Sequence, residues 1–202
     1  MKQRELEMLL QRVPPHPKPK AELEQYQTPA PIAADLVYRA LAAGDITDKR
    51  VLDLGCGTGI LGIGAALCGA SHVLAADIDL DAMRVGEEAA RSLGVMPETL
   101  SWRVGKVEEM RLPADTVLMN PPFGAQRPGA DRPFHLTALA CAPVVYTLVN
   151  AETLDWAQRF YVGAGARVTA TWSYRFALSA QFVWHDKPRA HIEVAALRAV
   201  RA

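Results

Sequence analysis

The sequence predicts an α/β protein with a seven-stranded, mostly parallel sheet, helices on both faces and an antiparallel pair of strands at the C-terminal end. From Val51 onward, short apolar runs alternate with segments of helical periodicity, which is the pattern of a parallel sheet connected by helices. The final part of the chain instead has two stretches of alternating side chains, residues 167–178 and 191–200. Such alternation is typical of strands that pair side by side.

Length and charge set the first limits. The chain has 202 residues, of which 50% are hydrophobic and 22% are charged, so it can bury an ordinary core. We predict one domain, 1–202, in which residues 1–20 form an N-terminal arm and a proline-rich linker. Lys plus Arg and Asp plus Glu both number 22, so the formal net charge is zero. Any surface for nucleic acid must therefore be a local patch, because dedicated nucleic-acid binders are usually basic.

Nothing in the sequence indicates a metal site, a disulfide framework or a membrane segment. The cysteines, Cys56, Cys68 and Cys141, and the five histidines lack the paired spacing of metal ligands. No apolar run reaches the ~20 residues of a membrane span, and the N-terminus lacks the apolar core of a signal peptide. We therefore predict a cytoplasmic protein with no metal and no membrane contact.

The first twenty residues are expected to be a solvated arm. Residues 2–12 place leucines at roughly helical spacing. The four prolines between residues 14 and 19 exclude regular structure after them. Lys18 and Lys20 could contact phosphate from this arm.

A helix over residues 31–43 leads into the sheet. Thr28 is expected to cap it, and Gly44 suits its end. The remaining elements follow in order: strands at 50–54, 72–77, 100–104, 115–119 and 144–149, and helices at 58–68, 81–93 and 152–161.

A glycine-rich loop lies between the first strand and the helix after it. Gly55, Gly57 and Gly59 allow a tight turn and let a ligand approach the backbone closely. Thr58 and Ile60 open the helix, whose free N–H groups and positive dipole end favour a polar ligand. The spacing is G-x-G-x-G, which differs from the G-x-G-x-x-G of dinucleotide enzymes. The alternative is a tight turn in an α/β fold without a cofactor.

Two carboxylates complete this cradle. Asp77 ends the second strand, where an acidic residue commonly binds ribose hydroxyls, with Asp79 as a competitor. Asp53, just before the turn, suits a cationic amino group. S-adenosylmethionine (SAM) requires both contacts, so SAM is the predicted cofactor.

A second strand-to-loop junction, Asn120-Pro121-Pro122-Phe123, is expected to hold the group that reacts. An exocyclic adenine amine is a poor nucleophile, because its lone pair is delocalised into the ring. The Asn120 side-chain carbonyl and the Pro121 main-chain carbonyl could accept its two hydrogens, and proline stiffens the loop. Phe123 offers a ring for stacking a flat base. The alternative is a proline-rich turn with no chemical role.

These motifs together resemble the class I methyltransferases that modify amino groups, and most closely the methyltransferase-like protein five family with its archaeal relatives. The likeness extends from about Leu6 to Arg198. Further similar runs are Leu23-Glu24-Gln25-Tyr26, Asp115–Gly124, Ala142–Tyr146 and His191–Val194.

The resemblance implies a Rossmann-like fold and an activity. The expected reaction is transfer of the SAM methyl group to adenine N6 in structured RNA, with small-subunit rRNA as the expected substrate. Gln25 and Thr28 are implied to contact SAM. A small zinc-bearing activator subunit, docked along an edge strand, is the implied partner.

The sequence departs from the family at two places. Lys106 stands where the family has an aspartate that meets the SAM adenine, so the main-chain N–H of Val107 is expected to serve instead. The segment 184–189 carries fewer positive charges than the family's lysine-rich run.

Three other functions fit parts of the pattern. A guanine-N2 RNA methyltransferase would use the same loop. A glutamine-N5 protein methyltransferase usually has tyrosine where this chain has Phe123. A non-catalytic SAM-binding RNA module would have the cradle without transfer.

Other side chains near these motifs have less definite roles. Phe134 and His135 could line the substrate pocket, although a lone histidine more often packs. Possible stacking platforms are Trp172, Tyr174, Phe176, Phe182 and Trp184, most of which are expected to pack in the core. Arg175, Lys187 and Arg189 are candidate phosphate contacts, with solvation as the alternative for each.

Overall fold

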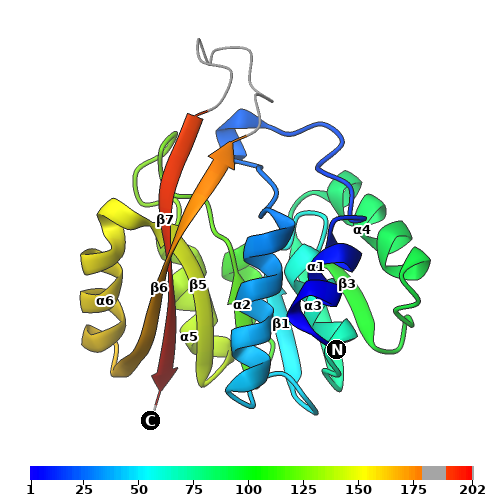
Figure 1. The fold of residues 1–202 in the computed structure, drawn as a ribbon. Coiled ribbons are helices and arrows are strands. Elements are labelled where there is room, and N and C mark those ends of the chain that lie inside the picture. Colours follow the sequence, from blue (N-terminus) through cyan, green and yellow to red (C-terminus); the bar gives the residue numbers. More distant parts are fainter. Residues whose placement is uncertain (179–189, 202) are drawn as a thin grey trace.

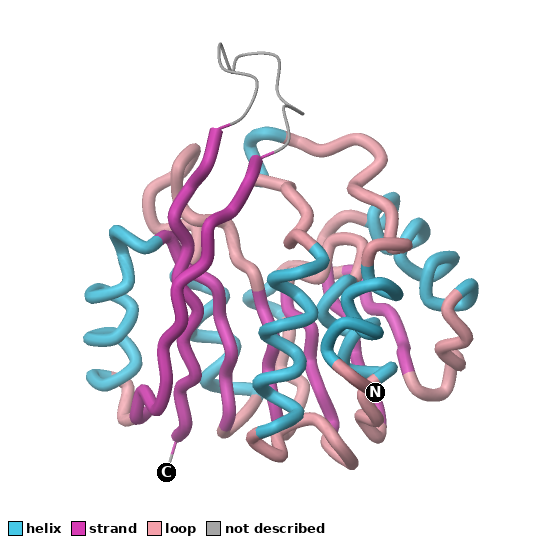
Figure 2. Tube along the Cα trace, viewed as in Figure 1, coloured by secondary structure: helices cyan, strands magenta, loops and turns pink. Residues whose placement is uncertain are grey.

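A computed structural model describes residues 1–178 and 190–201. Seven strands form one sheet in the order β3-β2-β1-β4-β5-β7-β6. The first five strands of this order are parallel, whereas β7 runs antiparallel to both β5 and β6. The predicted fold class is confirmed, including the antiparallel pair that ends the chain (Figures 1 and 2).

The strand bounds lie close to the expected ones. They are β1 Arg50–Leu54, β2 His72–Asp77, β3 Leu100–Val104, β4 Thr116–Met119, β5 Val144–Asn150, β6 Ala166–Leu178 and β7 Ala190–Arg201. The helices are α1 Gln3–Leu10, α2 Ala30–Ala42, α3 Ile60–Leu67, α4 Leu80–Ser92, α5 Arg132–Cys141 and α6 Leu154–Gly163, with short 3₁₀ turns at Ala21–Leu23, Val107–Glu109 and Ala151–Thr153.

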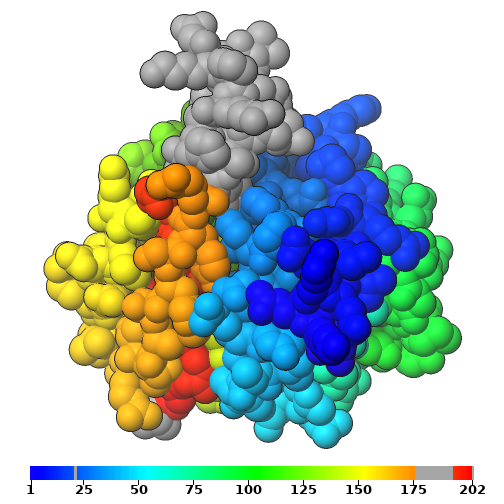
Figure 3. All heavy atoms as spheres, in the orientation of Figure 1, coloured from blue at the N-terminus to red at the C-terminus, as the bar shows by residue number. Residues whose placement is uncertain are grey.

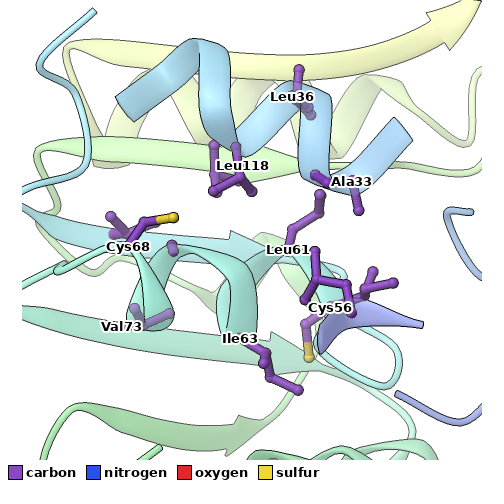
Figure 4. Close-up of a cluster of buried hydrophobic side chains, with 14 of the residues drawn as sticks. Ala33, Leu36, Cys56, Leu61, Ile63, Cys68, Val73 and Leu118 are labelled. Atoms are coloured by element: carbon purple, nitrogen blue, oxygen red, sulfur yellow. The ribbon is translucent and has the colours of Figure 1, made fainter. Parts of the chain in front are cut away.

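Each strand supplies side chains to both faces of the sheet, because successive residues of a strand point in opposite directions. Leu118 belongs to the core under α1, α2, α3 and α4, whereas Val117 belongs to the core under α5 and α6. In the first of these cores, Leu36 of α2 and Leu61 of α3 pack with Leu118 of β4 (Figure 4). Burial on both faces explains why the central strands are continuous apolar runs in the sequence.

The expectation of a solvated N-terminal arm is wrong. Leu6 and Leu10 of α1 are fully buried, and Val13 is 4% exposed. Helix α1 packs against α2 and α3 in front of the sheet (Figures 1 and 3). The leucines at helical spacing therefore form a buried stripe that anchors the start of the chain.

Two local predictions also fail. Helix α5 was missing from the expected elements, although its Pro133 lies in the first turn, where proline is well tolerated. Thr28 does not cap α2, whose N-cap is Pro29, with no side-chain cap. Gly44 does follow the end of α2 with φ +76°, as its conformational freedom predicts.

Some candidates lie outside the described residues, namely Phe182, Trp184, Lys187 and Arg189. Across residues 1–178 and 190–201, no helix has both the length and the apolar composition that crossing a bilayer requires.

Candidate active site

The glycine loop, residues 55–59, joins β1 to α3 and has no room for a side chain at Gly55 or Gly59. Gly55 and Gly59 have φ values of +72° and +75°, which disfavour any side chain. A Cβ on Gly55 would lie 2.6 Å from Cε1 of Phe134, and one on Gly59 would lie 2.4 Å from Cη2 of Trp102. Backbone conformation and close packing therefore both require glycine here.

Asp53 lies beneath this loop. It is 1% exposed, and one carboxylate oxygen accepts a hydrogen bond from the N–H of Gly62 at 2.7 Å. Burial raises the pKa of Asp53 to about 7, against the opposing effect of that hydrogen bond, and the nearby charge of Asp77 adds to the rise. An incoming cation would stabilise the ionised carboxylate, so the site is suited to a ligand ammonium group.

Asp77 lies at the end of β2, beside the loop. Its two oxygens accept hydrogen bonds from the N–H groups of Gly57 and Asp79, both at 2.8 Å. Burial raises its pKa, although both hydrogen bonds act to lower it. The carboxylate is thus fixed in direction at the wall of the cavity, as ribose recognition requires.

Asp79, the alternative candidate for the ribose contact, has its side-chain oxygens engaged within the protein. Its side chain caps α4 and accepts hydrogen bonds from Lys20 at 2.8 Å and from Gln25 at 3.1 Å. Burial acts to raise the pKa of Asp79, but the bonds from Lys20 and Gln25 outweigh it and hold the pKa below its usual range. Lys20 is therefore engaged by Asp79.

The second junction follows β4, which lies between β1 and β5. Because β1 and β4 are parallel neighbours, the loops at their carboxyl ends meet at one edge of the sheet. Asn120 donates from Nδ2 to Oγ1 of Thr28 at 3.0 Å. Its Oδ1 is buried and has no hydrogen-bond partner among the residues that the structure describes. A buried acceptor without a donor is costly, so this oxygen calls for a ligand donor.

A segment between α1 and α2, residues 14–29, closes the cavity from the N-terminal side; we name it the N-terminal strap. Lys20 and Gln25 attach it to Asp79, and Glu24 attaches it to the loop after β4. The contact of Glu24 could not be predicted from the sequence, since glutamates are common in exposed turns.

The glycine loop, the strap and the loop after β4 enclose a cavity of about 450 Å³. Most of the predicted site residues line it: Gln25, Thr28, Asp53, Gly55, Gly57, Thr58, Ile60, Asp77, Val107, Asn120 and Pro122. Gly59, Pro121 and Phe123 are not among the lining residues. The structure therefore brings the two motifs together, and the individual roles stay predictions.

Three neighbouring ring side chains, Phe123, Phe134 and His135, differ in their position relative to the cavity. The ring of Phe123 lies 5.5 Å from that of Tyr26, so it packs against the strap. Phe134 lines the cavity, in agreement with the expectation that it could line the substrate pocket. His135 does not; it is fully buried, with Nδ1 2.9 Å from the hydroxyl of Tyr161 in α6, which fits the packing alternative.

Lys106 and Val107 both line the cavity. Lys106 is exposed and precedes the 3₁₀ turn Val107–Glu109. A lysine can only donate hydrogen bonds, so it cannot accept from an adenine amino group.

The aromatic candidates of the final strands fit a packing role where they are described. Trp172 stacks on Tyr146 at 6.3 Å with an angle of 6° between the rings, and the guanidinium of Arg39 lies 5.0 Å from the centre of the Trp172 ring. Tyr174 donates to Asp35 at 2.6 Å. Arg175 pairs with Glu193 at 3.1 Å on the exposed surface.

A family model and several known proteins match this chain in sequence. The family model described as ribosomal protein L11 methyltransferase matches residues 34–120. An uncharacterised protein of Methanocaldococcus jannaschii is 34% identical, covering 98% of this chain and 94% of its own length. The rRNA N6-adenosine-methyltransferase METTL5 of Danio rerio is also 34% identical, covering 98% of both chains.

A solved structure extends this likeness to the whole fold. The crystal structure of a Pyrococcus horikoshii protein, proposed to be an RNA methyltransferase, superposes with a TM-score of 0.93. The two chains are 36% identical, and the match covers 100% of this chain and 98% of the other.

Proposed function

Because the chain belongs to the family of the METTL5 rRNA N6-adenosine methyltransferases and is a SAM-dependent methyltransferase, we propose that it methylates the N6 amino group of an adenine in structured RNA. We further propose small-subunit rRNA as the substrate. The observation that carries the proposal is the buried Oδ1 of Asn120, an acceptor without a donor at the cavity.

The residues of the cradle fit the cofactor. Asp77 would accept from the ribose hydroxyls, and Asp53 would meet the ammonium group. Main-chain N–H groups of the glycine loop and of Val107 would complete the contacts, with Gln25 and Thr28 on the strap side. When bound, SAM supplies a methyl group made electrophilic by its positive sulfur.

The acceptor loop, residues 120–126, would activate the amine. Oδ1 of Asn120 would accept one hydrogen of the amino group, and the carbonyl of Pro121 would accept the other. Both bonds favour a tetrahedral nitrogen, whose lone pair is no longer delocalised and can attack. No side chain is required as a base beforehand, because the nitrogen becomes more acidic once it is alkylated. Phe123 would stack on the base.

The test is methyl transfer from labelled SAM to small-subunit rRNA, followed by nucleoside analysis. We expect N6-methyladenosine with the wild-type chain and none with Asn120→Ala. Label in N2-methylguanosine would support an RNA methyltransferase but identify guanine, not adenine, as the methylated base. Label in protein glutamine would favour the protein-methylating alternative. Transfer to no acceptor, with or without a candidate activator, would favour the non-catalytic module.

We also propose that a small zinc-bearing activator subunit docks along β3. This strand is at an edge of the sheet, and Val104 on it is 50% exposed. Leu80, which opens α4 after the neighbouring β2, is 46% exposed. Exposed apolar residues along an open edge suit a protein partner. Calorimetric titration with the purified candidate subunit should show binding to the wild-type chain and markedly weaker binding to Val104→Asp; equal binding would contradict the edge as the docking site.

A further inference from the structure

The side-chain carboxylate of Glu24, in the strap, binds the backbone of the acceptor loop. One carboxylate oxygen accepts a hydrogen bond from the N–H of Phe123 at 2.7 Å, and the other accepts from the N–H of Gln126 at 2.8 Å. Hydrogen bonds from two N–H groups to one carboxylate are charge-assisted and therefore stronger than bonds between neutral groups. Both ends of the carboxylate are thus used on one short loop.

The acceptor loop needs such an external partner. Pro121 and Pro122 carry no N–H, so the loop lacks two backbone donors directly after Asn120. The N–H of Phe123 is the first donor available beyond them. Fixing that N–H fixes the peptide plane next to the prolines, and the prolines transmit the constraint because their φ angles are restricted.

The backbone of Glu24 is itself strained. Its φ is +50°, a left-handed conformation that non-glycine residues rarely adopt. Such strain persists only where the surrounding structure compensates it, and it occurs often at functional sites. Here the two hydrogen bonds to the acceptor loop provide compensation.

The neighbours of Glu24 connect the same segment to the rest of the site. Gln25 bonds to Asp79, two residues beyond Asp77. Tyr26 packs against the ring of Phe123. Thr28 accepts from Nδ2 of Asn120, which leaves Oδ1 of the same side chain for the cavity. The strap therefore contacts the side chain of Asn120, the ring of Phe123 and the backbone between them.

We propose that Glu24 is a positioning residue for methyl transfer, whose carboxylate fixes the acceptor loop so that Oδ1 of Asn120 and the carbonyl of Pro121 face the incoming amine. This inference rests on the proposed function. Glu24 does not touch the reacting atoms; it acts through the main chain of Phe123 and Gln126. A loop released from this clamp keeps all its functional groups but holds them less accurately, and small displacements of reacting groups are expensive in rate.

The test compares Glu24→Ala and Glu24→Gln with the wild-type chain, and Glu98→Ala serves as a control at an exposed glutamate. We expect kcat to fall about tenfold to a hundredfold in E24A, while the SAM dissociation constant changes by less than about threefold. The amide oxygen of E24Q can still accept one of the two N–H groups, so its kcat should lie between those of E24A and the wild type. Glu98→Ala should match the wild type.

Hydrogen exchange provides a readout that needs no methyl acceptor. Amides 123 and 126 should exchange faster in E24A than in the wild type, with unchanged exchange in the glycine loop. Unchanged exchange at both amides, or an unchanged kcat in E24A, would overturn the proposal. A wild-type chain that transfers no methyl group would contradict the proposed function, and the exchange result would still decide whether Glu24 holds the loop.

Discussion

The cofactor side of the cavity is built from short pieces of chain that satisfy one another, whereas the acceptor side is assembled from segments far apart. Asp53 is bonded to a residue 9 positions away, and Asp77 to residues 2 and 20 positions away. On the acceptor side, Thr28 and Asn120 are 92 positions apart, and Glu24 and Phe123 are 99 apart. The carboxylates of the cradle have donors, but Oδ1 of Asn120 has none within the described residues.

This difference suggests that the two sides of the cavity are organised for their ligands in different ways. The cradle is fixed before any ligand arrives, since its backbone and carboxylates already hold one another. On the acceptor side, Oδ1 of Asn120 is left without a donor within the described residues, and the strap holds Asn120 and the loop after it in position. Ligand affinity should therefore depend mainly on the cradle, and rate mainly on the acceptor side.

The sharpest test of this division is Asn120→Ala. We expect kcat to fall by about a hundredfold or more, on the order of 3 kcal/mol, because one acceptor for the transition state is lost. SAM affinity, measured by calorimetry, should hardly change. Asn150→Ala at the end of β5 is the matched control and should leave kcat unaltered. Equal losses of SAM affinity and kcat in Asn120→Ala would break the division.

The pH dependence of stability tests whether the buried carboxylate of Asp53 destabilises the protein when no ligand is bound. The pKa of Asp53, raised to about 7, exceeds that of an unfolded aspartate. The native chain therefore binds a proton that the unfolded chain releases, so this contribution is full below about pH 4 and is lost as the pH rises through 7. Urea denaturation without SAM should show stability falling over this range by on the order of 3 kcal/mol.

Asp53→Asn should flatten that profile, since the amide oxygen can still accept from Gly62 without titrating. Asp155→Asn, at an exposed position of α6, should retain the wild-type slope. A wild-type stability that rises between pH 4 and pH 7 would show that Asp53 stays ionised in the empty cradle.

Asp77→Ala should show the converse of Asn120→Ala. Loss of a charged acceptor for the ribose hydroxyls should weaken SAM binding by at least about tenfold, as hydrogen bonds to charged groups imply. At saturating SAM, kcat should fall much less. Asp81→Ala, exposed in the first turn of α4, is the control for calorimetry. Tight binding of NAD in place of SAM would mean that the cradle has been misinterpreted.

Phe123→Ala should have the smallest effect. Without the ring, a base is positioned less well, so the apparent RNA KM should rise and kcat should fall, each severalfold. SAM affinity should stay as in the wild type. Phe160→Ala, which removes a ring from α6, should lower stability but leave KM unchanged. A KM unaffected by Phe123→Ala would confine this ring to packing against Tyr26.

The same contrast explains what the sequence could predict. The strands β1 to β3 were located to the residue because each is a short run, mostly apolar in β1 and β2, that fits the alternation of strands and helices. The cradle was predictable because its glycines and carboxylates follow consecutive strands. The contacts of the strap were not, since spacing along the chain carries no information about pairs some 92 to 99 residues apart. For the same reason the hydrogen bonds of Lys20 to Asp79 and of Thr28 to Asn120 were not predicted.

The separation of Glu24 from Phe123 also has a consequence for synthesis. At about 5–20 residues per second, roughly 5 to 20 s pass between translation of Glu24 and of the acceptor loop, which lies 99 residues later. The glycine loop and Asp77 are made within that interval. The glycine loop and Asp77 therefore leave the ribosome before the acceptor loop does, and the carboxylate of Glu24 has no partner on that loop until Phe123 and Gln126 have been made.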